Sequence, residues 1–298
     1  MGQHSNKKVL IVANPKSGKY REQVFQRRLA DILSTQGLSG ELYCFAGQED
    51  LAKRLTKARS EPVDAFVVVG GDGTVAMVAS HLRRKPAPIF IIPAGTTNLL
   101  AQVLGIPIGI KDALNLLASP TETKTIDGLE INGRLFFMNA SIGLSSSSVK
   151  EVKQERKSSL GIFAYVLAVI RRVVKATSHR FSLEIDGKLQ QVEAAEIFIA
   201  NIGAVGMPKY RLADSQFDDG KLEVCVIYKN TPRELLNALL DLLVRKRKRS
   251  IHRIARGERI TISCEEHLPV QADGDVVEET PVTIEVVPRA ATFVVPRS

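Results

Sequence analysis

The segment VVVGGDGTVAMVAS, residues 67–80, constrains the fold more than any other stretch of the chain. Its consecutive valines predict a strand buried on both faces, which is typical of the centre of a parallel sheet. Glycines on both sides of Asp72 then predict a tight turn of bare backbone, and the residues after the turn predict a helix. A strand, a glycine turn and a helix in this order indicate an α/β domain whose turn is suited to phosphate groups.

The chain around this segment alternates strands and helices. Apolar runs predict strands at residues 8–15, 40–47, 64–71 and 87–95, and amphipathic stretches predict helices at residues 20–37, 48–60, 74–85 and 96–105. We therefore predict a three-layer α/β/α nucleotide-binding domain at residues 1–126. The loops NPKSGK, GGDGT and PAGTTN each follow a strand, so we expect them at the carboxyl edge of the sheet, where such folds bind ligands.

From residue 127 onward the pattern is that of antiparallel strands. Alternating apolar and polar residues are separated by Asn-Gly and Asp-Gly pairs, which are strong turn signals. Helical stretches at residues 160–176 and 232–249 interrupt the strands. We predict a mostly β substrate domain at residues 127–298, with a last strand that can return to the first domain.

Composition is that of a folded, intracellular protein. The chain is 44% apolar and 24% charged, and its three cysteines, Cys44, Cys225 and Cys264, share no metal-ligand spacing. The start of the chain lacks a secretory apolar segment, and the nine-residue apolar run at residues 162–170 is shorter than the roughly 20 residues that a membrane span needs. We expect a cytoplasmic protein that can bind peripherally at the inner membrane face.

The formal net charge of the chain is +9, and its basic residues are concentrated in one segment. Seven Lys and Arg residues occur within residues 245–256, directly after a predicted helix with a leucine-rich face. An apolar face beside a basic run is typical of a helix at an anionic membrane surface, and equally of a core helix that ends in cations. Nucleic acid is a poor candidate partner, because aromatic residues make up 5% of the chain and tryptophan is absent.

Two common phosphate motifs fail in this sequence. NPKSGK lacks two anchors of the P-loop, because Ala13 and Tyr20 replace its first glycine and its final hydroxyl residue. GDGTVA fits the glycine pattern G-x-G-x-x-G/A of a dinucleotide site, from Gly71 to Ala76, but no Asp or Glu that could bind the ribose occurs between Asp72 and Asp112. A carboxylate among bare amides indicates a triphosphate bridged by Mg²⁺, since Asp72 alone would repel phosphate. The alternative is that Asp72 is a turn residue and helix N-cap.

Six segments, in order, resemble the signatures of the diacylglycerol kinase catalytic-domain family, which includes bacterial diacylglycerol and lipid kinases and the sphingosine kinases. These segments are NPKSG, GGDGT, IPAGTTNLLA, DDGKLEV, QADGD and the closing VVP. The resemblance implies ATP as phosphoryl donor, Mg²⁺, and a diacylglycerol-like or sphingoid-like hydroxyl as acceptor. GGDGT also occurs in NAD kinases, so an enzyme with a soluble acceptor such as NAD stays an alternative.

The resemblance also implies roles for individual residues. Asp72 would join the Mg²⁺ network at the phosphates, and Asp273 would accept the proton of the acceptor hydroxyl. A structural Mg²⁺ would be held by Asp218, Asp219 and the carbonyl of Lys221. The implied nucleotide site comprises Asn14, Lys16, Ser17, Gly70, Gly71, Asp72, Gly73, Thr74, Thr96, Asn98 and Asp275. Apart from this resemblance, the Asp-Gly pairs in DDGK and ADGD predict hairpin turns.

Several positions depart from the family pattern. Ala76 and Met77 stand where many members have Asn-Glu, and Leu99 stands where many have an acidic residue. Asp275 replaces the Glu of a DGE signature, and its side chain is one methylene shorter. Each change removes or shortens a polar group at the expected Mg²⁺ network or acceptor site. A nucleotide- or lipid-binding protein with impaired catalysis is therefore a further alternative, and homodimerisation stays open.

Overall fold

The structure is a computed structural model that describes residues 7–17, 22–83, 87–143, 177–201, 216–228 and 252–297. The helices expected at residues 160–176 and 232–249 lie outside the described residues. Within the described ranges, no helix is both long and apolar enough to cross a membrane.

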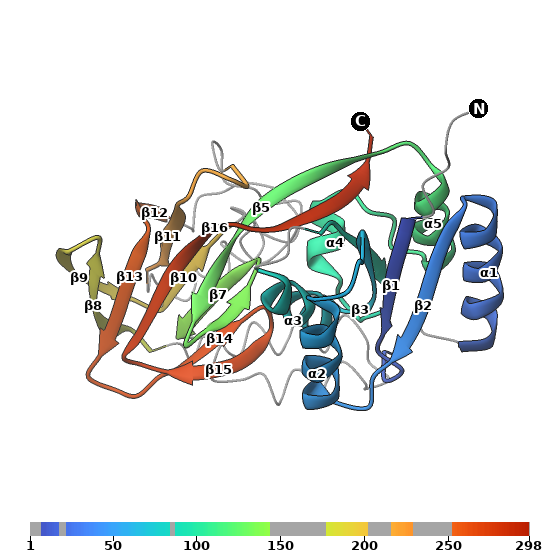
Figure 1. Cartoon of the computed structure of the whole chain (residues 1–298). Helices are drawn as coiled ribbons and strands as arrows, with labels where there is room; N and C mark the ends of the chain where they lie inside the picture. Colours follow the sequence, from blue (N-terminus) through green and yellow to red (C-terminus); the bar gives the residue numbers. More distant parts are fainter. Residues whose placement is uncertain are drawn as a thin grey trace, which may run out of the picture.

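Four parallel strands form the sheet of the first domain, in the order β2-β1-β3-β4. All six residues of β3 are buried, as the run of valines predicts. Helices α2 and α3 pack against each other, as do α1 and α5, and these two pairs cover the sheet as outer layers (Figure 1). The elements are β1 (Lys7–Ala13), α1 (Glu22–Thr35), β2 (Leu38–Cys44), α2 (Gln48–Ala58), β3 (Ala65–Gly70), α3 (Asp72–Leu82), β4 (Ile89–Pro93), α4 (Leu99–Val103), α5 (Ile110–Asn115) and the 3₁₀ turn η1 (Leu116–Ala118).

Two long strands, β5 (Thr121–Ile131) and β16 (Val282–Pro296), connect the two halves of the molecule (Figure 1). They pair antiparallel with each other, and β16 also pairs with β4 of the first domain and with β13 of the second. One ten-stranded sheet therefore runs through both halves. Residue 127, where we place the start of the second domain, lies inside β5.

The second half is a sandwich of two sheets around an apolar core. The far end of the long sheet packs against a six-stranded sheet of order β12-β11-β10-β7-β14-β15. Asn132-Gly133 and Asp186-Gly187 form tight turns with positive φ at both residues, as the Asn-Gly and Asp-Gly signals predict. The strands are β6 (Arg134–Phe136), β7 (Asn139–Gly143), β8 (His179–Ile185), β9 (Lys188–Ala194), β10 (Glu196–Ala200), β11 (Leu222–Ile227), β12 (His252–Gly257), β13 (Arg259–Cys264), β14 (Pro269–Ala272) and β15 (Asp275–Glu279).

The predicted fold class, an α/β/α nucleotide-binding domain followed by a mostly β domain, is confirmed. Two helix starts differ from the expectation. Helix α3 begins at Asp72, two residues early, and α4 begins at Leu99, three residues late. The late start follows from Asn98, whose backbone is left-handed with φ 49° and cannot continue a right-handed helix.

Candidate active site

The loops that follow β3 and β4 touch each other through their glycines. A Cβ atom built on Gly95 would lie 2.6 Å from the Cα atom of Gly71, so the loops approach more closely than any side chain allows. Asn98, which is 2% exposed, fixes the second loop by accepting a bond from the Gly95 amide and donating one to its carbonyl, both 2.9 Å. The floor of the candidate site is therefore a pair of interlocked turns.

Asn14 brings the loop after β1 to the same place. Its Nδ2 donates to Oγ1 of Thr74 at 3.2 Å, and its Oδ1 accepts from the amide of Lys16 at 3.0 Å. The amide of Ser17 closes the turn on the Asn14 carbonyl at 3.0 Å. The three loops predicted to share one edge of the sheet thus lie together.

The start of α3 is open to a ligand. Gly73 is exposed, and a Cβ built on it would meet nothing within 4 Å, whereas a Cβ on Gly70 would lie 2.7 Å from Thr74. Thr96, in the neighbouring loop, is also exposed. The amino end of an eleven-residue helix with free space beside it suits an anion such as phosphate.

Asp72 joins the two interlocked loops through its carboxylate. Oδ1 accepts from the Leu100 amide at 3.0 Å, while Oδ2 accepts from the Leu99 amide at 3.0 Å and the Thr97 hydroxyl at 3.3 Å. Asp72 thus caps the start of α4, not of its own helix α3. A carboxylate offers about four acceptor positions, so Oδ1 keeps room for one further partner.

Asp273 reaches the site from the second domain. It lies in the β14–β15 turn with φ 47°, followed by Gly274 with φ 94°. Its carboxylate accepts from the amides of Phe137 at 2.9 Å, Met138 at 3.0 Å and Asn139 at 3.1 Å. Residue Asp275, one position after the turn, is exposed. The Asp-Gly pair is therefore a turn, as its sequence signal predicts, and also presents a carboxylate held by three amides.

The ionisation of Asp273 depends on both domains. Burial raises the pKa of Asp273 to about 6; the three amides oppose the rise, and the negative charge of Asp72 adds to it. The negative charge of Asp72 therefore disfavours the ionisation of Asp273. A cation placed between the two carboxylates would relieve that effect.

In the DDGK turn, residues 218–221, a carboxylate pairs with an arginine side chain as well as with a backbone amide. Asp219 accepts from the Lys221 amide at 3.0 Å and forms an ion pair with Arg256, while Asp218 is exposed. The Arg256 guanidinium also lies 3.0 Å from the buried carboxylate of Glu223. These contacts give Asp219 a partner on each oxygen, and the positive charge of Arg256 would oppose a Mg²⁺ ion at this turn.

Asp127 is an important residue that the sequence analysis missed. It is 1% exposed, and its carboxylate accepts from the amides of Gly220 and Arg289, both at 2.7 Å. Its carbonyl accepts from Nδ2 of Asn201 at 2.7 Å, and that same Nδ2 donates to the Phe137 carbonyl at 2.9 Å. Asp127 therefore connects β5, the DDGK turn and β16 to the segment that holds Asp273. In the sequence Asp127 stands in TETKTIDGLEI, where Glu122 and Glu130 are also acidic and Asp127-Gly128 resembles a turn signal, so nothing there marks it as buried.

Three of the four positions that depart from the family pattern, all but the exposed Asp275, face the core of the first domain. Ala76 is 5% exposed, and the half-buried Met77 and Leu99 pack against the same core. Apolar residues at these positions thus add to packing.

Two family models match the chain. Residues 8–131 match the diacylglycerol kinase catalytic domain, and residues 139–295 match the YegS C-terminal NAD kinase beta sandwich-like domain. A Staphylococcus epidermidis protein named "Putative lipid kinase" is 27% identical over 239 residues, covering 78% of this chain and 76% of that protein. An uncharacterized Synechocystis protein is 27% identical over 260 residues, and the match covers 83% of this chain but only 59% of that protein.

Solved structures give the same picture. A structure described as a putative diacylglycerol kinase from Bacillus anthracis superposes with a TM-score of 0.77 at 27% identity. The superposition covers 98% of this chain and 97% of that one, so the similarity includes both domains and their junction.

Proposed function

Because the chain belongs to the diacylglycerol kinase catalytic-domain family, we propose that it transfers the γ-phosphoryl group of ATP to the hydroxyl group of a diacylglycerol-like or sphingoid-like lipid. The observation that carries the proposal is the contact of α3, which begins at Asp72, with β6, which ends beside the amides that hold Asp273. The first domain contributes three loops that suit phosphate groups. The second domain contributes the carboxylate of Asp273, which is held by three backbone amides. We also propose that residues 1–126 and 127–298 act as the two domains of this enzyme.

In this proposal the loops of the first domain bind the nucleotide. The amino end of α3 and the exposed Gly73 and Thr96 receive the phosphates, while Asn14 and Asn98 hold the loops in position. Asp72 would hold Mg²⁺, directly or through water, because its carboxylate has an acceptor position left beyond its three hydrogen bonds. When bound, Mg²⁺ neutralises phosphate charge during phosphoryl transfer.

Asp273 accepts the proton of the acceptor hydroxyl. A pKa of about 6 leaves its carboxylate mostly ionised at neutral pH, yet basic enough to take a proton. The amides of residues 137–139 fix the direction of the carboxylate, so it does not need to reorganise when the hydroxyl arrives.

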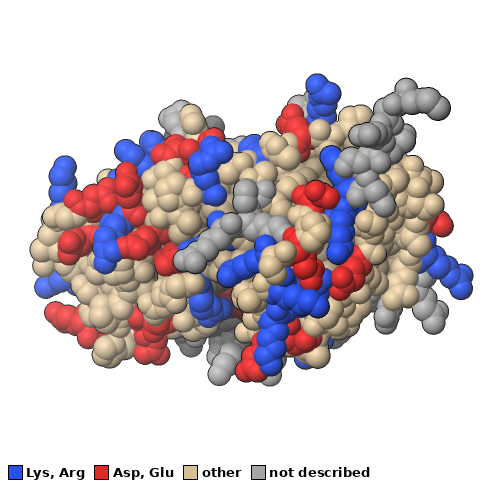
Figure 2. All heavy atoms as spheres, in the orientation of Figure 1, with Lys and Arg blue, Asp and Glu red and all other residues tan. Residues whose placement is uncertain are grey.

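A lipid acceptor requires contact with a membrane surface, and we assign that contact to the basic run at residues 245–251 and the adjacent residues 232–244. On the face shown in Figure 2, Lys and Arg are interspersed with Asp and Glu over the described residues. Arg253 and Arg256, which follow this run in the described part of the chain, lie in β12 against Glu223. The assignment therefore rests on the net charge of +9 and on a run outside the described residues.

The test is a phosphorylation assay with labelled ATP, Mg²⁺ and a panel of diacylglycerol, sphingoid bases and NAD. We expect labelled lipid, no labelled NAD, and loss of labelling in Asp273→Asn. Asp186→Asn is the matched control, because Asp186 also sits in an Asp-Gly turn and accepts two amides, those of Glu258 and Arg259 at 2.9 Å. Labelling of NAD alone, or equal lipid labelling by wild type and Asp273→Asn, would contradict the proposal.

A further inference from the structure

One end of the β sandwich carries three metal-ligand side chains on neighbouring strands. His179 begins β8, Cys264 ends β13, and Glu266 follows two residues later. These strands are antiparallel, with Cys264 opposite Phe181, and continuing the register by two residues sets Glu266 opposite His179. Alternate residues of a strand share one face, so all three side chains project on the face where Phe181 enters the core.

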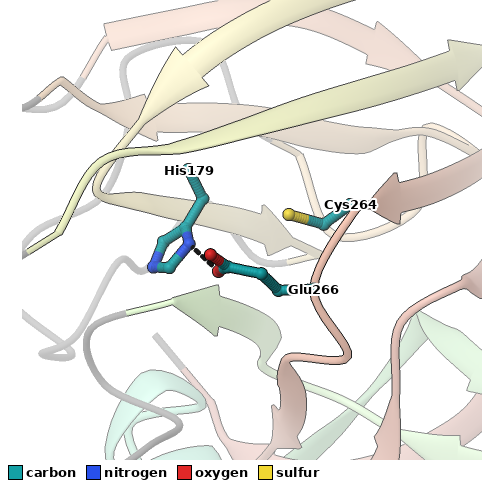
Figure 3. Close-up of side chains that lie close together, drawn as sticks. All are labelled: His179, Cys264 and Glu266. Atoms are coloured by element: carbon teal, nitrogen blue, oxygen red, sulfur yellow. Dashed lines mark ion pairs between the residues drawn. The ribbon is translucent and has the colours of Figure 1, made fainter.

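The three side chains converge. Among the described residues, the ligand atoms of His179, Cys264 and Glu266 all lie within 4.8 Å of one another. Figure 3 shows the His179 ring joined to the Glu266 carboxylate by an ion pair at Nδ1, with the sulfur of Cys264 pointing toward both. The other ring nitrogen, Nε2, lies 3.0 Å from Oγ1 of Thr177. Metal-ligating histidines commonly have such a partner at the second nitrogen, because it fixes the tautomer and the ring direction.

The surroundings favour a cation. The three residues line a pocket of about 310 Å³ together with Ser178, Arg180, Glu193 and Glu265. Arg180 and Glu193 stand opposite each other across β8 and β9, so their charges offset. Glu265 and Glu266 then leave the pocket with a negative balance.

We propose that His179, Cys264 and Glu266 bind a transition-metal ion, with Zn²⁺ the ion that the donor set fits best. Imidazole nitrogen, thiolate sulfur and carboxylate oxygen are the three ligand types of protein zinc sites, and three protein ligands leave one position for water. Nδ1 of His179 binds the ion. Nε2 keeps its proton and donates a hydrogen bond to Oγ1 of Thr177. The thiol of Cys264 loses its proton to solvent on binding.

The small adjustment that binding requires falls on Glu266. Its side chain is exposed and lies beyond the end of β13, whereas His179 and Cys264 are half-buried in strands. Glu266 can therefore turn its carboxylate from the imidazole to the ion without moving the sheet. The ion would join β8 to the segment after β13 and close this end of the sandwich.

The proposal is tested on the full-length, chelator-treated and reduced protein by titration with Co²⁺ as a spectroscopic probe, followed by displacement with Zn²⁺. We expect one Co²⁺ per chain and a thiolate-to-cobalt charge-transfer band that Zn²⁺ removes. The band should vanish in Cys264→Ser and persist in Cys44→Ser, whose exposed thiol lies in β2 of the first domain. Absence of the band in wild type, or its retention in Cys264→Ser, would overturn the proposal.

Glu266→Gln gives a second measurement that does not depend on the cysteine. Because Glu266 is exposed, this variant keeps the fold, which circular dichroism verifies. We expect its Zn²⁺ affinity to fall at least about 10-fold, since even partners of metal ligands are worth about 10–100-fold. Glu265→Gln removes the same charge from the same pocket without removing a proposed ligand, and should lower the affinity much less than Glu266→Gln does. Equal losses in the two variants would show a general charge effect and refute direct ligation by Glu266.

Discussion

The pH dependence of the proposed phosphoryl transfer follows from the environment of Asp273. With a pKa of about 6, the carboxylate is about 90% ionised at pH 7 and about 10% ionised at pH 5. If Asp273 accepts the hydroxyl proton only when ionised, kcat/KM falls nearly 10-fold over these two pH units. An aspartate of ordinary pKa would leave kcat/KM almost flat over the same range.

The charge of Asp72 is one cause of the raised pKa of Asp273, and this gives the prediction a second arm. Asp72→Asn removes that charge, so we expect the Asp273 midpoint to move to lower pH. We would measure kcat/KM between pH 4.5 and 8, and follow the Asp273 carboxyl by carbon NMR so that the midpoint is visible even if Asp72→Asn is nearly inactive. Asp273→Asn provides the baseline for pH effects of the substrates. An unchanged midpoint in Asp72→Asn would refute the coupling of the two carboxylates across the domain junction.

The raised pKa of Asp273 affects stability in the opposite direction to activity: activity rises with pH, whereas the contribution of this group to the free energy of unfolding falls. Between the unfolded value of about 3.8 and the folded value of about 6, the folded chain holds the proton of Asp273 more tightly than the unfolded chain does. The stabilisation from this group is full below pH 3.8 and is lost as the pH rises through 6. Its size is about 3 kcal/mol at most, at about 1.4 kcal/mol per pKa unit.

Three further substitutions follow from the contacts of the site. Gly95→Ala should cost about 1–3 kcal/mol in urea unfolding, because its Cβ would strike the backbone of Gly71. Gly73→Ala should leave stability nearly unchanged and raise the KM for ATP by filling the space beside α3, so a larger loss of stability here than in Gly95→Ala would contradict the packing argument. Asn201→Ala should cost about 1–3 kcal/mol, because two carbonyls lose a donor. Asn201→Ala should also raise the pH of the titration midpoint of Asp273, because the amides of residues 137–139 would hold its carboxylate less firmly. An unchanged midpoint would show that Asn201 does not support the site.

The sequence predicts local features well because they depend on neighbouring residues. The valines before Gly70 form a fully buried central strand, and the Asn132-Gly133 and Asp186-Gly187 pairs form turns with positive φ. The start of α4 could not be predicted in the same way. Its first amides are capped by Asp72, which lies 27 residues before Leu99.

The missed features depend on contacts between distant strands. Asp127 is buried only because Gly220 and Arg289 come to it from two remote segments. His179 and Cys264 share no motif spacing, and only the register of β8 against β13 brings them together. The roles implied for Asp218, Asp219 and Lys221 stay predictions, since ion pairing with Arg256 is what the structure contains there.

The path of β16 has a consequence for how the chain folds during synthesis. The strand occupies the place beside β4, yet it is made after every other strand of the sheet. Until it emerges, β4 has an open edge, and an unpaired edge strand can pair with other chains. The first domain therefore cannot finish folding on the ribosome ahead of the second, as an amino-terminal domain usually does. Both halves reach their final form in one late step, and chains cut before β16 are expected to aggregate.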